Sequence, residues 1–449
     1  MSQTLLSVGI DVGTSTTQLV FSRLTVKNEA DAFSVPQFAI SEKEILYRSR
    51  IHFTPLLSAD RIDARGVEKI VEEEYRLANV KKESVQTGAV IITGETARKE
   101  NAAEVLSALS GFAGDFVVAT AGPALESILA GKGSGAATYS KEHSCSVLNL
   151  DIGGGTTNMA LFENGKLCDT GCLNIGGRLM KFDAHGRCVY LSDVLKPFFT
   201  LDSDPHEVAQ FLSDCLEEAV GLRKGETYRA FITDKLCQSA PLLSFSGGVA
   251  ELIHDEAMED FAYGDLGVLL GRAIFHSALC KGPYLKAKET IRATVIGAGS
   301  HTTELSGSTI FYDHAQFPLK NLPVVVLSEA EENTSSTELC ESILRHLALF
   351  PDSPAVIALN GKRNPDFKEL CKLAEGISLA LQKDLRSPCV ICVAQDIGKA
   401  LGQAITMQLG ACPLICLDGL TLHDGAYLDI GRPIADGQVL PVVIKTLIL

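Results

Sequence analysis

One short pattern occurs twice in this chain and restricts the fold more than any other feature. Each copy has an apolar strand that ends in an aspartate, a glycine-containing turn, and hydroxyl residues that open a second strand. The first copy runs from Val8 to Thr17 and the second from Leu148 to Asn158. Glycine lets backbone N–H groups approach an anion, and the hydroxyls add donors. We therefore expect two phosphate-binding hairpins, about 140 residues apart, that hold a nucleotide between two similar half-molecules.

The aspartate at the tip of each hairpin has a different role from the glycines. A carboxylate does not bind phosphate directly, but it can hold a hydrated Mg²⁺ that does. Asp11 and Asp151 are therefore the candidate catalytic and metal-binding acids. The candidate phosphate-binding residues are Gly13, Thr14, Ser15 and Thr16 on one side, and Gly153, Gly154, Gly155, Thr156 and Thr157 on the other.

A third glycine element follows the two hairpins. Ser246, Gly247 and Gly248 end an apolar strand and precede a predicted helix. Two glycines let a base and ribose lie against the backbone at a helix N-terminus, so these residues are the candidate adenosine site. The segment 295–300 competes for this role as a predicted strand followed by Gly299, but it ranks second because it comes after the helix that should complete the second half. The segment 131–135 lacks the spacing of a P-loop, and we expect an ordinary loop there.

Length and composition limit the classes of protein that fit. A chain of 449 residues is too long for one ordinary core and predicts two or three domains. The net charge of −15 disfavours nucleic acid and anionic membranes as partners. The apolar run 400–417 contains Gln403, Gln408 and Pro413, which favours a helix and a strand over a membrane span. With no basic signal-peptide start, we expect a cytoplasmic protein.

Cysteine and histidine give no sign of a metal or redox site. The 13 cysteines are scattered, which predicts reduced thiols. Cys389 and Cys392 form a CxxC pattern, but they lie in a predicted strand, where these two side chains would face opposite sides. The 10 histidines show no metal-ligand spacing.

The order of predicted elements indicates a mixed α/β fold with three parts. We expect a first lobe over residues 1–145, a second lobe over 146–289, and an additional C-terminal α/β region over 290–449. In the last region short apolar strands alternate with helices, which predicts a mostly parallel sheet with helices outside it. The final segment is expected to form a β-hairpin cap.

The two hairpins and the third glycine element, in this order and spacing, resemble the actin/Hsp70/sugar-kinase ATPase superfamily. The resemblance implies a bilobal fold of two ribonuclease-H-like lobes with ATP or ADP in the cleft. It also implies a connecting helix after the last strand of each lobe. The segments 122–131 and 264–274 look like these two helices.

A more specific resemblance spans essentially the whole chain. The segments 92–102, 151–158, 173–178, 427–433 and 440–445 together resemble the ethanolamine ammonia-lyase reactivating factors. The resemblance implies a bacterial molecular chaperone that uses ATP and Mg²⁺ to release damaged cobalamin from the lyase, so that adenosylcobalamin can enter. It leaves open whether the protein forms a homo-oligomer and whether it associates with a bacterial microcompartment.

One position departs from the wider superfamily. Hsp70-like members have a glutamate just before the proline of the first connecting helix, where it helps to position the attacking water. Gly122 stands at that position here. Glu95 is the candidate substitute because it follows a strand that should end near the cleft, whereas Glu126 is expected to be a structural surface acid. We therefore expect slow hydrolysis, which suits a switch whose output is a lobe movement.

Two other functions fit the same fold. A small-molecule kinase would need a catalytic base that faces an acceptor hydroxyl, and no carboxylate motif stands out beyond Asp11 and Asp151. A nucleotide-binding scaffold without turnover is favoured by Gly122. In the chaperone hypothesis, the C-terminal region supplies part of the contact with the lyase, and the acidic surface steers the protein toward a basic patch.

Overall fold

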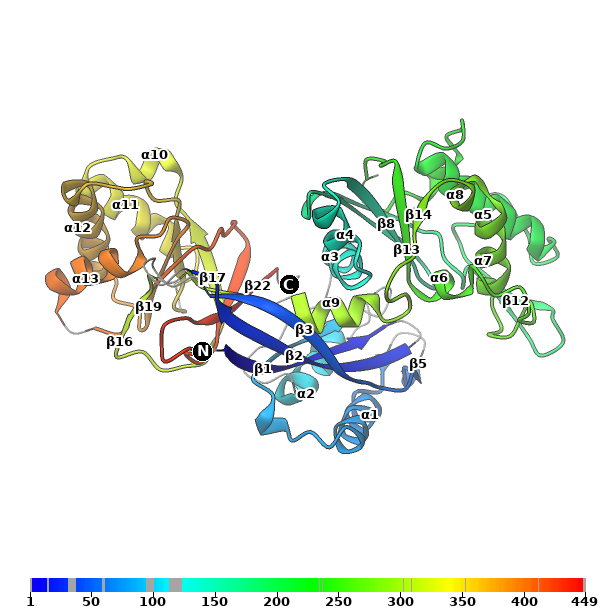
Figure 1. Ribbon diagram of the computed structural model, residues 1–449, viewed down its shortest axis with the longest axis horizontal. Helices are drawn as coiled ribbons and strands as arrows, with labels where there is room; N and C mark the ends of the chain where they lie inside the picture. Colours follow the sequence, from blue (N-terminus) through cyan, green and yellow to red (C-terminus); the bar gives the residue numbers. More distant parts are fainter. Residues whose placement is uncertain are drawn as a thin grey trace.

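The computed structural model contains two lobes and a C-terminal α/β body (Figure 1). It is mixed α/β with two similar sheets on either side of one cavity, so the bilobal fold class is confirmed. The domain boundaries at 145/146 and 289/290 stay predictions. The structure describes residues 2–13, 16–30, 38–58, 61–93, 101–112, 123–233, 235, 237–301, 303–307, 309–351, 353–410 and 412–446.

The first lobe is built on a five-stranded sheet. The strand order is β3-β2-β1-β7, and β4 pairs with β2. β1 is antiparallel to β2 and parallel to β7, and helices α1 and α2 pack on the sheet through a shared apolar cluster. A short two-stranded sheet, β5 with β6, lies beside it. The elements are β1 (Ser2–Val12), β2 (Thr16–Asn28), β3 (Phe38–Arg48), β4 (His52–Phe53), β5 (Leu56–Ser58), β6 (Arg61–Ile62), α1 (Ala64–Leu77), β7 (Thr87–Ile92) and α2 (Ala102–Leu109).

The second lobe repeats the central part of this design. Its sheet has the order β10-β9-β8-β13-β14, with β8 antiparallel to β9 and parallel to β13. Helices α5, α6 and α7 complete its core. The elements are α4 (Ala136–Glu142), β8 (Ser146–Ile152), β9 (Thr157–Glu163), β10 (Lys166–Leu173), β11 (Met180–Phe182), β12 (Cys188–Leu191), α5 (Pro205–Ala219), β13 (Leu242–Ser246), α6 (Gly248–Leu252), α7 (Gly267–His276), α8 (Ala278–Lys281) and β14 (Tyr284–Leu285).

Two helices cross between the lobes. α3 (Pro123–Gly133) packs against β8, β9 and β10 of the second lobe, and α9 (Ala293–His301) packs against β1, β2 and β7 of the first. In Figure 1, α9 lies between α3 and the blue sheet. A Cβ on Gly297 would collide with the carbonyl oxygen of Leu129, and one on Gly9 would collide with that of Val295. Glycine therefore permits the close approach of α3, α9 and β1.

The position of α9 corrects two expectations. The segment 295–299 is helical and not a strand, because its glycines serve close packing and do not end a strand. The segment 264–274, expected to be the second connecting helix, forms part of α7, which contacts α5, α6 and α8 inside the second lobe. α9 provides the second crossing. The segment 131–135 is also not a simple loop, since α3 continues to Gly133.

The C-terminal body has an eight-stranded sheet of order β15-β22-β21-β17-β18-β19-β20-β16. Only β17 to β20 are mutually parallel, so the expectation of a mostly parallel sheet holds for its centre alone. β21 and β22 form the predicted terminal hairpin, which is built into the sheet and does not cap it. The strands are β15 (Thr303–Leu305), β16 (Phe311–Asp313), β17 (Leu319–Val326), β18 (Val356–Leu359), β19 (Cys389–Val393), β20 (Leu414–Asp418), β21 (Ala426–Ile430) and β22 (Pro441–Thr446).

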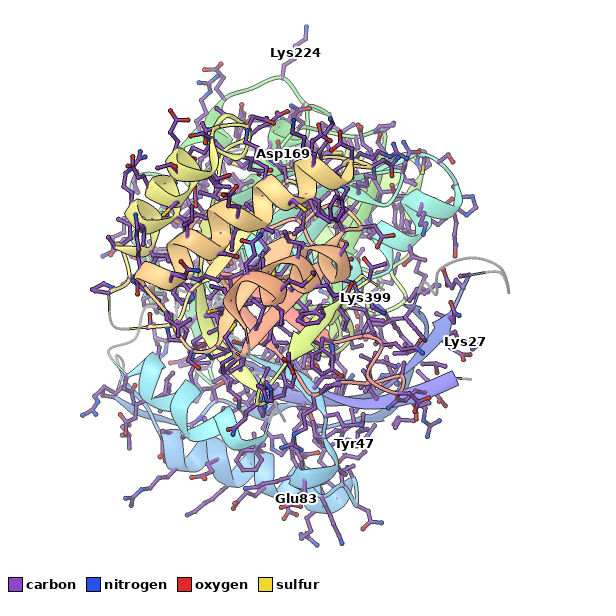
Figure 2. The ribbon with its side chains drawn as sticks, turned by 90° about the vertical axis from the view of Figure 1, so that its left-hand side faces the viewer. Lys27, Tyr47, Glu83, Asp169, Lys224 and Lys399 are labelled. Carbon is purple, nitrogen blue, oxygen red and sulfur yellow. The ribbon has the colours of Figure 1, made fainter. Side chains whose placement is uncertain are left out.

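Helices cover one face of this sheet. α10 (Glu329–Glu332), α11 (Ser336–Leu347), α12 (Phe367–Lys383) and α13 (Gly398–Leu409) follow the parallel strands, and the last three pack on one apolar cluster. Figure 2 shows this layer from outside, with Lys399 of α13 in front. Cys389 belongs to the helix-side cluster and Cys392 to the opposite one, as their spacing predicts. No helix in the described part of the chain is both long and apolar enough to cross a membrane.

Candidate functional site

The two hairpins and the third glycine element line one cavity of about 430 Å³ between the lobes. The cavity contains both tip acids and residues from each group predicted from the sequence. The predicted residues that line it are Asp11, Gly13, Thr16, Asp151, Gly153, Gly154, Gly155, Thr156, Gly247 and Gly248. Glu95, Thr14, Ser15 and Gly122 lie outside the described residues, so their predicted roles are not tested.

Asp11 is the last but one residue of β1 and projects into the cavity. Its carboxylate accepts a hydrogen bond of 2.8 Å from the hydroxyl of Thr93, which follows the neighbouring strand β7. Burial raises the pKa of Asp11 to about 7; the hydrogen bond from Thr93 opposes this rise, and the negative charge of Asp151 adds to it. A cation would favour the ionised form of a buried carboxylate that has a second carboxylate nearby.

Asp151 holds the same position at the end of β8 and has more support. Its carboxylate accepts a hydrogen bond of 2.6 Å from Ser246, and Asn149 donates to the Ser246 hydroxyl at 2.9 Å. Ser134 donates in turn to Asn149 at 3.1 Å. Burial raises the pKa of Asp151 to about 6, and hydrogen bonds from Ser246 and Thr294 oppose the rise. A chain of buried side chains therefore fixes the orientation of this acid.

The glycines leave backbone open to the cavity. A Cβ placed on Gly155 or Gly248 would meet no atom within 4 Å, so a ligand can approach the main chain at both positions. Gly247 has a different role, because its φ of 91° is strained for other residues and its Cβ would collide with Ile152. Gly248 opens α6, whose first N–H groups lack partners within the helix.

Two predicted residues do not line the cavity. Thr157 is buried, and its hydroxyl donates to the carbonyl oxygen of Ile175 at 2.8 Å, which ties the hairpin to the segment after β10. Ser246 is also buried and contacts Asp151, so it supports the acid.

Several lining residues were not found from the sequence. Arg178 is the one basic side chain among the described lining residues, against five acids. Its Nε lies 3.2 Å from Asp265, whose other oxygen accepts the N–H of Gly267. The backbone of Arg178 donates to Gly154 at 2.6 Å, which places this cation beside the second hairpin. Arg178 ends the segment 173–178 that carries the family resemblance, and the Gly176-Gly177 pair precedes it, but neither feature indicated a place in the cavity.

Other lining residues were also not predicted from the sequence. Glu126 lines the cavity, although the sequence suggested a surface acid. Ile51 and Phe53 from the first lobe and Tyr263 from the second lobe also line it, and Phe53 and Tyr263 are 78% and 56% exposed. These side chains add an apolar contribution to a wall otherwise rich in carboxylates and glycines. No motif marks them in the sequence.

The residues present fit a hydrated Mg²⁺. Mg²⁺ retains several waters and is held by one or two carboxylates together with substrate phosphates. The cavity offers two such acids, and no group of three or more His, Cys, Asp or Glu placed to hold a metal occurs among the described residues. Gln18 adds a buried side-chain oxygen without a hydrogen-bond partner in the described chain, and it also lines the cavity. A dedicated protein cage for a bare ion does not fit this arrangement.

Comparison with known proteins gives matches over nearly the whole chain. The family model described as ethanolamine utilisation protein EutA matches residues 3–449. The chain is 37% identical to "Ethanolamine ammonia-lyase reactivase EutA" of Escherichia coli (strain K12), over 99% of this chain and 98% of that protein. The protein of the same name from Salmonella typhimurium (strain LT2) matches with the same identity and coverage.

Solved structures are more distantly similar. The Ppx/GppA family member of Aquifex aeolicus has a TM-score of 0.42 and 16% identity, over 66% of this chain and 97% of that one. The ethanolamine utilization protein EutJ of Carboxydothermus hydrogenoformans has a TM-score of 0.34 and 17% identity, over 65% and 88% of the two chains. The family assignment rests on the full-length matches. The chain belongs to the ethanolamine utilisation protein EutA family.

Proposed function

We propose that this chain is an ATP-dependent reactivase of ethanolamine ammonia-lyase. It would bind Mg²⁺ and ATP between its lobes and use lobe movement to release damaged cobalamin from the lyase, so that adenosylcobalamin can bind. The names of the two full-length relatives support the partner. The observation that supports the chemistry best is that Asp11 and Asp151, from equivalent hairpins of the two lobes, line the same cavity.

The proposal assigns roles to the residues of the cavity. Asp11 and Asp151 would hold the waters of Mg²⁺, which, when bound, neutralises charge on the phosphates during hydrolysis. Backbone N–H groups of the two turns would donate to the phosphate chain, with Thr16 and Thr156 adding hydroxyls. Gly247 and Gly248, at the start of α6, would lie against the adenosine. Thr14, Ser15 and Glu95 stay in the proposal as further phosphate and catalytic residues.

The link from ATP to the partner is a change in lobe angle. A ligand shifts a conformational equilibrium only if it binds the two states with different affinity. ATP contacts both hairpins, whereas ADP lacks one phosphate, so the two nucleotides favour different separations of Asp11 and Asp151. α3 and α9, which cross between the lobes, would carry the change. We expect slow turnover, because such a switch must dwell in each state.

The proposal extends to the surroundings of the protein. The C-terminal body, built on its own sheet, would supply part of the contact with the lyase. The protein would work in the cytoplasm beside its partner. Cofractionation would test whether it associates with a bacterial microcompartment. The net charge of −15 would steer it toward a basic patch on the lyase.

A reactivation assay tests the proposal. Ethanolamine ammonia-lyase is inactivated during turnover, and this protein is then added with Mg²⁺, ATP and fresh adenosylcobalamin. We expect lyase activity to return, to fail without ATP, and to fail with the Asp151→Ala variant. No recovery with the intact protein, or equal recovery without ATP, would contradict the proposal.

A further inference from the structure

Gln18 presents an unusual buried atom to the cavity. The residue is 4% exposed, and its Oε1 has no hydrogen-bond partner in the described part of the chain. Buried polar side-chain atoms nearly always have a partner in the protein or in ordered water. Since Gln18 also lines the cavity, the missing partner can come from what the cavity holds.

The orientation of the Gln18 amide follows from its neighbours. Its Nε2 lies 3.4 Å from the carbonyl oxygen of Ile291 and 3.5 Å from the hydroxyl of Thr16. A carbonyl oxygen can be faced only by the donor end of an amide. Oε1 is therefore the free end, and it needs a donor. Phosphate oxygens accept and cannot serve, whereas a water molecule can.

The position of Gln18 indicates which water could donate to Oε1. Gln18 is directly opposite Asp11 in the antiparallel pair of β1 and β2, so both side chains emerge on the same side of the sheet. Both line the cavity together with Asp151. A metal ion held by these carboxylates would carry waters that donate hydrogen bonds, and Oε1 would be an acceptor for one of them.

We propose that Gln18 is a positioning residue whose Oε1 accepts a hydrogen bond from a water of the hydrated Mg²⁺ held between Asp11 and Asp151. The proposal rests on the proposed function of the cleft. It assigns Gln18 to the metal's hydration shell and not to the phosphate chain. The removal of Oε1 should therefore weaken the metal's contribution to nucleotide binding and leave metal-free binding nearly unchanged.

The second hairpin supplies an informative parallel. Asn158 is opposite Asp151, as Gln18 is opposite Asp11, and its Oδ1 is also buried without a partner in the described chain. Asn158 does not line the cavity. An amide faces each acid, but only the longer glutamine side chain of the first hairpin reaches the space between the lobes.

The test compares ADP affinity with and without Mg²⁺ by titration calorimetry. Gln18→Leu removes the acceptor with little change in size. We expect Gln18→Leu to reduce the Mg²⁺ enhancement of ADP affinity by roughly tenfold, as for other outer-shell partners of metals. Metal-free affinity should stay within about twofold, because a role confined to the metal's water gives Oε1 no contact with the nucleotide.

A matched control lies on the same strand. Ser22 of β2 is also fully buried with an unpartnered hydroxyl, and it is outside the cavity. Ser22→Ala should leave the Mg²⁺ enhancement unchanged, and the thermal unfolding midpoint of each variant reports on folding. Equal weakening with and without Mg²⁺ in Gln18→Leu, or no weakening, would overturn the role of Gln18. Absence of any Mg²⁺ enhancement in the unmodified protein would instead overturn the proposed function, and this inference with it.

Discussion

The two hairpins share one geometry but differ in how the protein supports their acids. Asp11 receives one hydrogen bond from Thr93, next to a strand of its own sheet. Asp151 receives a hydrogen bond from Ser246, whose hydroxyl accepts one from Asn149, and Asn149 in turn accepts one from Ser134. Burial raises both pKa values, to about 7 for Asp11 and about 6 for Asp151. The comparison indicates that the duplicated hairpin sets where the acids lie, and that each lobe sets how firmly its acid is held.

The largest effect should come from removing either acid. Asp11→Ala and Asp151→Ala should each lower Mg²⁺-dependent ATP turnover on the order of 100-fold, because each removes one of two groups that hold the metal. Steady-state phosphate release measures this. Asp169→Ala is the control, since this acid, labelled in Figure 2, pairs with Lys235 outside the cavity. A large loss in only one of the two variants would show that the hairpins are not equivalent.

The raised pKa values of the two acids predict that the stability of the nucleotide-free protein depends on pH. A raised pKa means that the folded state binds more protons than the unfolded chain, so the free energy of unfolding falls as pH rises from 3.8 to about 7 for Asp11 and to about 6 for Asp151. Asp11→Asn should therefore flatten the fall between about pH 5 and pH 8 more than Asp151→Asn does. Urea unfolding at several pH values measures it. Equal dependence of the unfolding free energy on pH in the two variants would contradict the predicted difference between the two acids.

A smaller effect should come from the residues that support the acids. Ser246→Ala leaves both the carboxylate of Asp151 and the amide of Asn149 without their shared partner, so it should lower the free energy of unfolding by about 1–3 kcal/mol. Thr93→Ala removes one hydrogen bond to a half-buried acid and should lower it by about 0.5–1.5 kcal/mol. Chemical denaturation compares the two variants. A larger loss in Thr93→Ala would contradict the difference in support.

The smallest effect should appear at the turn glycines. A Cβ on Gly155 meets open space, so Gly155→Ala should leave the unfolding midpoint within experimental error and weaken nucleotide binding by occupying the ligand's space. A Cβ on Gly13 would lie 3.1 Å from the carbonyl oxygen of Thr16, so Gly13→Ala should lower the midpoint as well. Thermal unfolding and nucleotide titration, made on both variants, separate the two outcomes. Normal nucleotide binding by Gly155→Ala would contradict the role of that turn.

The hairpins could be predicted from the sequence because their pattern is local and repeats. Strand, acid and glycine turn are adjacent in the chain, so the pattern predicts where Asp11 and Asp151 lie, while their catalytic and metal-binding roles stay predictions. Thr93 and Arg178 were missed because they reach the cavity only through the pairing of β7 with β1 and the fold of the segment after β10. Thr93 and Asp11 are 82 residues apart in the sequence, and the segment 173–178 gives no sign that Arg178 lies beside the second hairpin.

The prediction of a strand over residues 295–299, which lie in α9, was wrong for a related reason. Apolar residues alternating with Gly297 and Gly299 predict a strand that ends in a turn, since glycine disfavours helices by about 1 kcal/mol. In the structure the same glycines allow α9 to approach Leu129 and Gly9 closely. Tertiary packing outweighs the local preference there, and no single-sequence pattern reports it.

The most direct test of the central claim is a double-mutant cycle on Mg²⁺-dependent ATP binding. The affinity for ATP is measured by calorimetry with and without Mg²⁺ for the unmodified protein, Asp11→Asn, Asp151→Asn and the double variant. If one metal is held between the two acids, each single variant loses most of the Mg²⁺ enhancement, and the double variant loses little more. Additive losses, or ATP binding that does not respond to Mg²⁺, would contradict a shared site between the hairpins.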